Sequence, residues 1–162
     1  MYLSPEDMTA LYLTIRLAST VTIILILVGA PLSWWLARTK SFFKAPVSAL
    51  VALPLVLPPT VLGFYLLIAM GPSGPIGKVT GFIGFETLAF SYPGLVFASV
   101  LYSLPFVVQP LQNAFESIGD RPLEVAATLG ADGLQSFFFV AIPMAKPGFL
   151  TAAILGFAHT VG

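Results

Sequence analysis

Charged residues are scarce in this sequence, and their scarcity excludes most classes of soluble protein. Only 9% of the 162 residues are charged and 57% are hydrophobic, with a mean hydropathy of +0.96. Soluble domains carry about 25% charged residues, so we expect an integral membrane protein surrounded by the lipid bilayer. Lys+Arg and Asp+Glu number seven each. This balance argues against a nucleic-acid partner, which would require a basic patch.

Cysteine is absent and histidine occurs once, which limits the chemistry open to the chain. Without Cys there are no disulfides and no Cys-based metal sites. One histidine cannot hold a metal ion without further ligands. The sequence contains no Gly-rich loop followed by Lys and Ser or Thr, so the chain is not expected to bind ATP itself. We predict no catalytic group, no metal and no cofactor, and hence a protein that is not an enzyme.

Long uncharged runs predict a single all-α transmembrane domain over residues 1–162. Runs of 21, 33 and 29 uncharged residues begin after Arg16, Lys44 and Glu86, and a membrane-spanning helix needs roughly 20 apolar residues. After Lys146 only 16 residues remain, which reach about 24 Å as a helix, short of the roughly 30 Å hydrocarbon core. We therefore expect a fragment that lacks the C-terminal part of its fold. The predicted spans are residues 10–37, 46–70, 90–114 and an incomplete 145–162, with a cytoplasmic loop at 115–144.

The distribution of basic residues predicts the orientation of the chain. Arg38, Lys40 and Lys44 form the only dense basic cluster, and loops rich in Lys and Arg remain in the cytoplasm. The N-terminus is therefore predicted outside. The third span then runs inward and delivers residues 115–144 to the cytoplasm.

Proline interrupts the second predicted span. The run LPLVLPPT, Leu53–Thr60, contains three prolines. Each removes a backbone donor and clashes with the preceding helical turn, and the membrane tolerates the freed groups only beside protein or water. We expect Pro58, Pro59 and Thr60 to face a solute pathway or other helices. A simple kink is the alternative.

Two polar side chains in the later spans are candidates for the same pathway. His159 is an ionisable residue within an apolar run, and such residues are functional candidates by default. Gln109 is similarly placed in the third span, with Ser99 and Ser103 nearby. Hydrogen bonding between helices is the alternative for all four side chains.

The segment Gly71–Phe85 is rich in Gly and Pro and predicts an external loop. Its first residues, GPSG, match the Gly-x-Ser-Gly of rhomboid intramembrane proteases, with Ser73 as nucleophile and His159 as base. A nucleophile must lie within hydrogen-bond reach of its base, whereas Pro72 and Pro75 make this segment a turn. The protease interpretation remains an alternative that Ser73→Ala tests.

A short polar helix is predicted after the third span. Asp120 as a capping acid, followed by a proline in the first turn, predicts a helix over Pro122–Leu129. Gly130 is placed to end it in a left-handed conformation. A Phe-rich segment, Leu134–Val140, follows, and Pro143 then marks a new start.

These residues resemble the cytoplasmic loop signature of bacterial ABC-transporter permeases. That signature is Glu-Ala-Ala, a glycine four residues after the second alanine, nine further residues, and Ile-x-Leu-Pro. Valine replaces the first alanine here, and Val and Ile stand for the later Ile and Leu. An ordinary amphipathic connecting helix is the alternative. The matching residues are Glu124, Val125, Ala126, Gly130, Val140, Ile142 and Pro143.

The resemblance implies a type I ABC importer permease fold and a separate cytoplasmic ATPase. The helix at Pro122–Leu129 would dock in a groove of that ATPase, and small side chains would allow close approach. The residues assigned to ATPase coupling are Glu124, Ala126, Ala127, Gly130 and Pro143.

Three further stretches, Ala52–Gly71, Phe90–Ser91 and Leu155–Gly162, resemble the molybdate permeases of the ABC superfamily, and the similarity extends over essentially the whole chain. It implies an importer in the cell membrane with two identical permease subunits, two ATPase subunits and an external molybdate-binding protein. A permease for tungstate or sulfate, or a non-transporting structural subunit of a membrane complex, are the alternatives. In this interpretation the pathway candidates are Pro58, Pro59, Thr60, Gln109 and His159.

Overall fold

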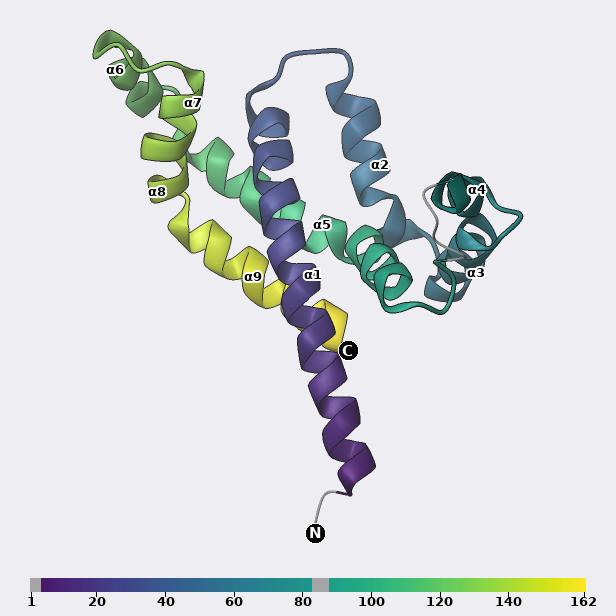
Figure 1. Cartoon of the computed structure of the whole chain (residues 1–162). Helices are drawn as coiled ribbons and strands as arrows, with labels where there is room; N and C mark the ends of the chain where they lie inside the picture. The colour runs from purple at the N-terminus through teal and green to yellow at the C-terminus, as the bar shows by residue number, and fades with distance from the viewer. Residues whose placement is uncertain (1–3, 83–87) are drawn as a thin grey trace.

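The computed structural model describes residues 4–82 and 88–162, and these residues form helices joined by short connections (Figure 1). No β-strand occurs in the part of the chain that the structure describes, and the all-α membrane fold is confirmed. The elements are α1 (Pro5–Arg38), α2 (Lys44–Val56), α3 (Pro59–Met70), α4 (Pro75–Phe82), α5 (Tyr92–Ile118), α6 (Arg121–Thr128), α7 (Gly133–Ser136), the π-helical turn η1 (Phe137–Ala141), α8 (Ile142–Met144) and α9 (Lys146–Val161).

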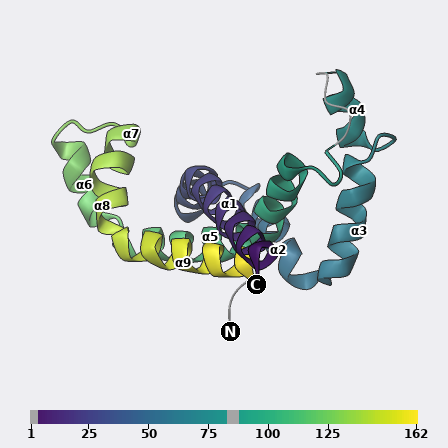
Figure 2. The same ribbon diagram turned by 60° about the horizontal axis from the view of Figure 1, so that its bottom comes forward.

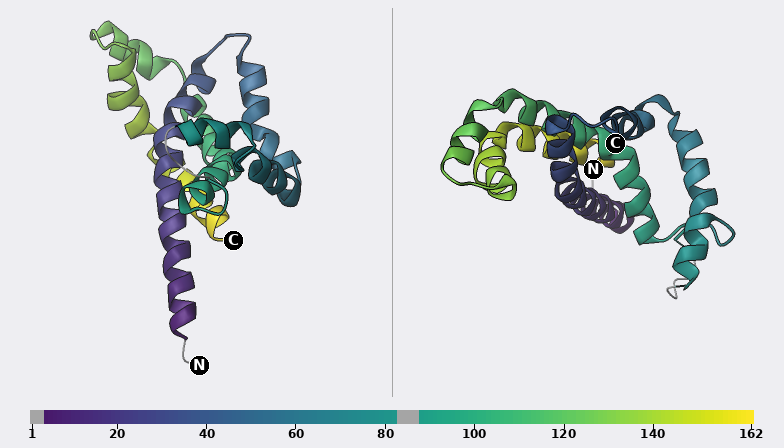
Figure 3. Two further views of the ribbon diagram at one scale, coloured as in Figure 1. Left: turned by 45° about the vertical axis from the view of Figure 1, so that its right-hand side comes forward. Right: turned by 90° about the horizontal axis from the view of Figure 1, so that it is seen from above.

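Helices α1, α5 and α9 cross one another and form the centre of the molecule, with α6 to α8 on one side and α3 and α4 on the other (Figures 1 and 2). Val21 of α1, Val107 of α5 and Ala152 of α9 lie in one fully buried cluster. The buried hydroxyl of Ser33 donates to the carbonyl oxygen of Val108 at 3.0 Å. Apolar packing and this bond hold α1 against α5, while the N-terminal turns of α1 project beyond the other helices (Figure 3).

Three stretches are long and apolar enough to cross a membrane, namely Pro5–Arg38, Pro59–Phe82 and Tyr92–Ile118. The first and third coincide with the predicted spans at 10–37 and 90–114. A fourth span arises if Gly133–Met144 and Lys146–Val161 are taken together, with a bend of 75° between them. The described residues therefore contain three to four apolar spans, although the second and the possible fourth differ in their bounds from the predicted 46–70 and 145–162.

The predicted second span, residues 46–70, is not one continuous helix. The chain leaves the helix at Leu57 (ψ 134°) and Pro58 (ψ 138°), which separate α2 from α3. Each of these two residues precedes a proline, and a residue before proline is pushed out of the helical region. The prolines therefore break the span instead of kinking it, and α3 continues in a different direction from α2 (Figure 2).

The predicted external loop, Gly71–Phe85, contains a helix. Helix α4 covers Pro75–Phe82, and its proline occupies the first turn, where the missing N–H is no loss. A Cβ atom on Gly77 would collide with the carbonyl of Gly71. The glycine therefore allows α4 to pack closely against the end of α3. Residues 83–85 of the predicted loop lie outside the described residues.

The orientation can be tested with single cysteines, because the chain has none of its own. Ser4, Ser41 and Ser73 are exposed in the structure. In intact cells, we expect a membrane-impermeant thiol reagent to label Ser4→Cys and Ser73→Cys but not Ser41→Cys, which lies beside the basic cluster. Permeabilised cells provide the control for reactivity at Ser41→Cys. Labelling of that variant before permeabilisation would reverse the orientation.

Candidate functional site

Helix α6 (Arg121–Thr128) confirms the short helix predicted at Pro122–Leu129. Gly130 has a φ of +88°, as predicted for a left-handed helix end. Its N–H donates to the carbonyl of Ala127, and the N–H of Ala131 donates to the carbonyl of Ala126, both at 3.0 Å. These two bonds form a Schellman motif, which satisfies carbonyls that the helix end would otherwise leave unpaired.

Asp120 does not cap α6, contrary to the prediction. Its backbone is in the right-handed helical region (φ −90°, ψ −32°) and its side chain makes no bond to the helix, because a capping residue needs an extended backbone. The carboxylate instead pairs with Arg38, with 2.6 Å between Oδ1 and Nη2, and Lys44 lies 3.7 Å from Glu116. Two partly exposed ion pairs, each worth up to about 1 kcal/mol, therefore join the basic cluster to the chain that leads into α6.

The outward surface of α6 differs from the predicted small-residue face. Ala126 is only 8% exposed, since α6 packs against α7 and η1. Ala127 and Glu124 are exposed as predicted, but Val125 and Leu129 dominate the free surface with 59% and 84% exposure. Ala126 supports the loop from within, and the free face of α6 combines the apolar Val125 and Leu129 with the charged side chains of Arg121 and Glu124.

Pro143 lies in the first turn of the short helix α8, as predicted, but the chain before it is already helical. The chain is helical from Gly133 to Met144, and the N–H of Ile142 reaches back five residues to the carbonyl of Phe137. Proline lacks an N–H and clashes with the carbonyl four residues before it, and a widened π turn directly before Pro143 relieves both effects. The longer helix α9 begins at Lys146, after the 75° bend.

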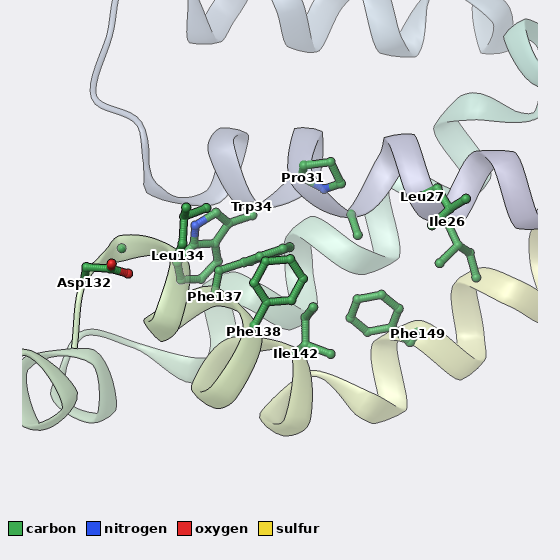
Figure 4. A pocket seen from close by; sticks show the side chains of 12 residues that line it. Ile26, Leu27, Pro31, Trp34, Asp132, Leu134, Phe137, Phe138, Ile142 and Phe149 are labelled. Atoms are coloured by element: carbon green, nitrogen blue, oxygen red, sulfur yellow. The ribbon is translucent and has the colours of Figure 1, made fainter.

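An apolar groove of about 880 Å³ lies between α1 and the segment from α7 to α9 (Figure 4). Trp34, Phe137 and Phe149 are among its lining residues. Asp132 is the only charged lining residue in the described chain, and its carboxylate accepts the N–H of Gln135 at 2.7 Å. An oxyanion would meet a carboxylate and no cation in this groove, so we do not assign it to a transported anion.

The structure brings only some of the predicted pathway residues together. Pro58, Pro59 and Thr60 are all exposed where α2 gives way to α3. Pro59 lines a small cavity of about 180 Å³ with Ser99 and Tyr102 of α5. Pro58 and Thr60 do not line it.

His159 and Gln109 lie along the same side of α5. The centre of the His159 ring is 4.6 Å from that of Tyr102 and 3.8 Å from that of Phe106. Gln109 is exposed and follows Phe106 by three residues, so Tyr102, Phe106 and Gln109 share one helix face. Because Tyr102 also lines the cavity at Pro59, three of the five predicted pathway residues gather around this face.

His159 takes part in hydrogen bonding between helices, one of its two predicted roles. Its Nδ1 lies 2.8 Å from Oγ of Ser103, which lies 3.3 Å from Oγ1 of Thr160. Sequence reasoning included Ser103 among several polar candidates and missed Thr160. The partners are 56 and 57 residues apart, and no pattern within either helix reveals that these side chains meet.

The protease alternative is not supported by this arrangement. Ser73 lies in the turn between α3 and α4, whereas the ring of His159 on α9 bonds Ser103. Helices α4 and α9 lie on different sides of the molecule (Figure 2). The described residues also contain no group of three or more His, Cys, Asp or Glu side chains that could hold a metal ion.

The sequence matches one protein-family model and several molybdenum permeases. The sequence model of the family described as binding-protein-dependent transport system inner membrane component matches residues 29–162. The chain is 65% identical to the molybdenum transport system permease protein ModB of Azotobacter vinelandii over 162 residues, covering 100% of this chain and 72% of that protein. It is 37% identical to the protein of the same name from Haemophilus influenzae (91% and 66% covered) and 33% identical to that from Escherichia coli K12 (100% and 71%).

Proposed function

The chain belongs to the family of binding-protein-dependent transport system inner membrane components, and we propose that it forms the membrane pathway of an ABC importer for molybdate. It is a multi-pass inner-membrane permease and not an enzyme. The observation that carries the molybdate assignment is the 65% identity to a molybdenum permease over all 162 residues. Because the chain spans 72% of that relative, its partners are part of the proposal.

In this proposal a cytoplasmic ATPase docks on α6. The helix exposes the apolar Val125 and Leu129 together with the charged Arg121 and Glu124, which suits a groove with apolar walls and polar groups at its edge. Gly130 and Pro143 shape the loop on either side of that surface. The ion pair between Arg38 and Asp120 supports the proposal, because it links the residue directly before α6 to the cytoplasmic end of α1.

The remaining proposed partners are a second copy of the permease and an external molybdate-binding protein. The side of α5 that carries Gln109 and adjoins Pro59 is proposed to line the pathway between the two copies. Polar side chains exposed at membrane depth support this placement, because lipid offers them no hydrogen-bond partner.

The proposal is tested by transport in vesicles that contain the assembled permease, its ATPase and its binding protein. We expect uptake of labelled molybdate that requires ATP and the loaded binding protein. Unlabelled tungstate and sulfate are added in competition at equal concentrations. Molybdate competing best supports the assignment, whereas stronger competition by tungstate or sulfate assigns the permease to that anion.

The same vesicles distinguish transport from a structural role. A transporting permease links loaded binding protein to hydrolysis, so the ATPase rate should rise when that protein is added. An ATPase that binds but is not stimulated, with no uptake, would indicate a structural subunit. Ser73→Ala serves as the matched control and should transport like the unmodified permease, because its side chain lies in the α3–α4 turn.

A further inference from the structure

The hydrogen bonds around His159 form a chain that ends on a backbone carbonyl. Thr160 Oγ1 donates to the carbonyl oxygen of Gly156 at 2.8 Å. A carbonyl can only accept, so the hydroxyl proton of Thr160 points to Gly156 and its oxygen is free to accept from Ser103. Ser103 then accepts from Nδ1–H of His159. This is the order of donors in which all three contacts are hydrogen bonds.

This order determines which nitrogen of His159 is free. In neutral imidazole one nitrogen donates and the other accepts, so a proton on Nδ1 leaves the lone pair on Nε2. When Nε2 also takes up a proton, Nδ1–H still donates to Ser103. The ring therefore gains a positive charge without turning and without breaking the chain of bonds.

Packing holds the His159 ring on the face of α5 that carries Tyr102, Phe106 and Gln109. Phe106 stacks on the ring with an interplanar angle of 24°. Ser103 is 1% exposed whereas His159 is half-buried, so Nδ1 bonds a buried partner while part of the ring stays accessible. The amide of Gln109 has no hydrogen-bond partner among the described residues. Polar groups at this depth face water or protein and not lipid.

The described residues place no acidic side chain beside His159. On α5 the titratable neighbour is Tyr102, and the acidic Glu116 lies 14 residues beyond it, about 21 Å along the helix. On α9 the other charged residue is Lys146, at the opposite end. Helix α1 carries acidic side chains only in its first turn, and its Arg16 lies over the ring of Tyr92. An imidazolium here is therefore paired by no carboxylate of the described residues.

We propose that Ser103 and Thr160 are positioning residues that hold His159 with Nδ1 as their donor, so that protonated Nε2 donates a hydrogen bond to the transported oxyanion. The oxyanion part rests on the proposed function. No bond in the solute is made or broken. A proton from water binds Nε2, the imidazolium donates to an oxygen of the anion, and the anion leaves when it moves past the ring.

The tautomer can be measured directly, because His159 is the only histidine in the chain. In the full chain labelled with ¹⁵N-histidine in lipid nanodiscs, we expect the neutral form to carry its proton on Nδ1. Ser103→Ala should move that proton to Nε2 or produce a mixture of both forms. Thr22→Val removes a buried hydroxyl that bonds only its own helix, at Ala18, and should leave the spectrum unchanged. A neutral ring protonated on Nε2 in the unmodified chain would overturn the proposal.

The contact with the anion has its own readout. Molybdate added to the labelled chain below neutral pH should shift the Nε2 signal more than the Nδ1 signal, and sodium chloride at equal ionic strength should not. In the transporting vesicles, His159→Gln and Ser103→Ala should raise the KM for uptake by about tenfold, the size expected for one hydrogen bond to a charged group. Thr22→Val should not change it.

These measurements separate the two proposals. If the unmodified permease transports and both His159→Gln and Ser103→Ala keep its KM, the role of His159 is wrong while the importer assignment stands. If the unmodified permease transports no oxyanion but shows the Nδ1–H tautomer and its loss in Ser103→Ala, the importer assignment fails and the positioning of the ring stands.

Discussion

Replacing Gly148 with leucine is expected to force α9 away from α5 and to destabilise the helix packing at the centre of the molecule. A Cβ atom at position 148 would collide with the Cβ of Ala114 and lie 3.4 Å from the carbonyl oxygen of Pro110. Both atoms belong to the α5 backbone or are attached to it, so neither can swing aside. Gly156, two turns later on the same face, would meet Cγ2 of Val107 at 2.7 Å. The two helices can approach this closely only because both positions are glycine.

Overpacking usually costs about 1–3 kcal/mol. Gly148→Leu should lower the free energy of unfolding by an amount at the upper end of this range or beyond it. Gly148→Ala should cause a smaller loss of the same sign. Thermal unfolding in detergent, followed by circular dichroism, measures both. The ¹⁵N signal of His159 should change as well, because its partner Ser103 lies across the same interface.

Gly63→Ala is the matched control for this prediction. Gly63 lies inside α3, and a Cβ atom there would meet nothing within 4 Å. Alanine favours a helix over glycine by about 0.5–1 kcal/mol, so this variant should be as stable as the unmodified chain or slightly more stable. Equal effects of alanine at positions 63 and 148 would contradict the close contact between α5 and α9.

Replacing Gly130 with valine is expected to weaken association with the ATPase strongly while membrane insertion remains normal. The φ of +88° at Gly130 costs an ordinary residue about 1–2 kcal/mol, and a β-branched side chain is still less tolerated there. The chain would relieve this strain by breaking the two bonds of the Schellman motif. Helix α6 would then present its free surface in a different direction from the one that the ATPase binds.

The measurements are co-purification of the ATPase and molybdate taken up per ATP hydrolysed. Gly133→Val is the matched control, because Gly133 begins α7 and a Cβ atom there would meet nothing within 4 Å. Gly133 has no positive φ, so valine should be tolerated. Normal co-purification and coupling in Gly130→Val would mean that α6 is a plain connector and would remove the basis for the docking proposal.

Substitutions within α6 should divide according to exposure. Leu129→Ser, at a position with 84% exposure, should weaken docking without destabilising the permease. Ala126→Leu would enlarge a buried residue, so its effect on docking would arise from displacement of the loop. Glu124→Gln should have the mildest effect, because an acidic residue near a helix N-terminus contributes only about 0.3–1 kcal/mol.

Features that depend on composition or on neighbouring residues could be predicted without coordinates. The membrane class followed from 9% charged residues, and two of the spans followed from the lengths of uncharged runs. The left-handed turn at Gly130 followed from one glycine after a short amphipathic pattern. These predictions succeed because hydrophobic burial and backbone sterics act over a few residues, which a sequence displays directly.

Features that depend on contacts between distant segments required the tertiary structure. Aspartate is a common helix-capping residue, but Asp120 has a helical backbone and its carboxylate pairs with Arg38, so it does not cap α6. Ala126 is buried because α6 folds back onto η1, a fact that helical periodicity cannot express. The hydrogen-bond chain at His159 needs α5 and α9 to be in contact. Each of these outcomes reflects which surfaces meet in three dimensions, because a side chain takes the partner that lies within reach, however far apart the two residues are in the sequence.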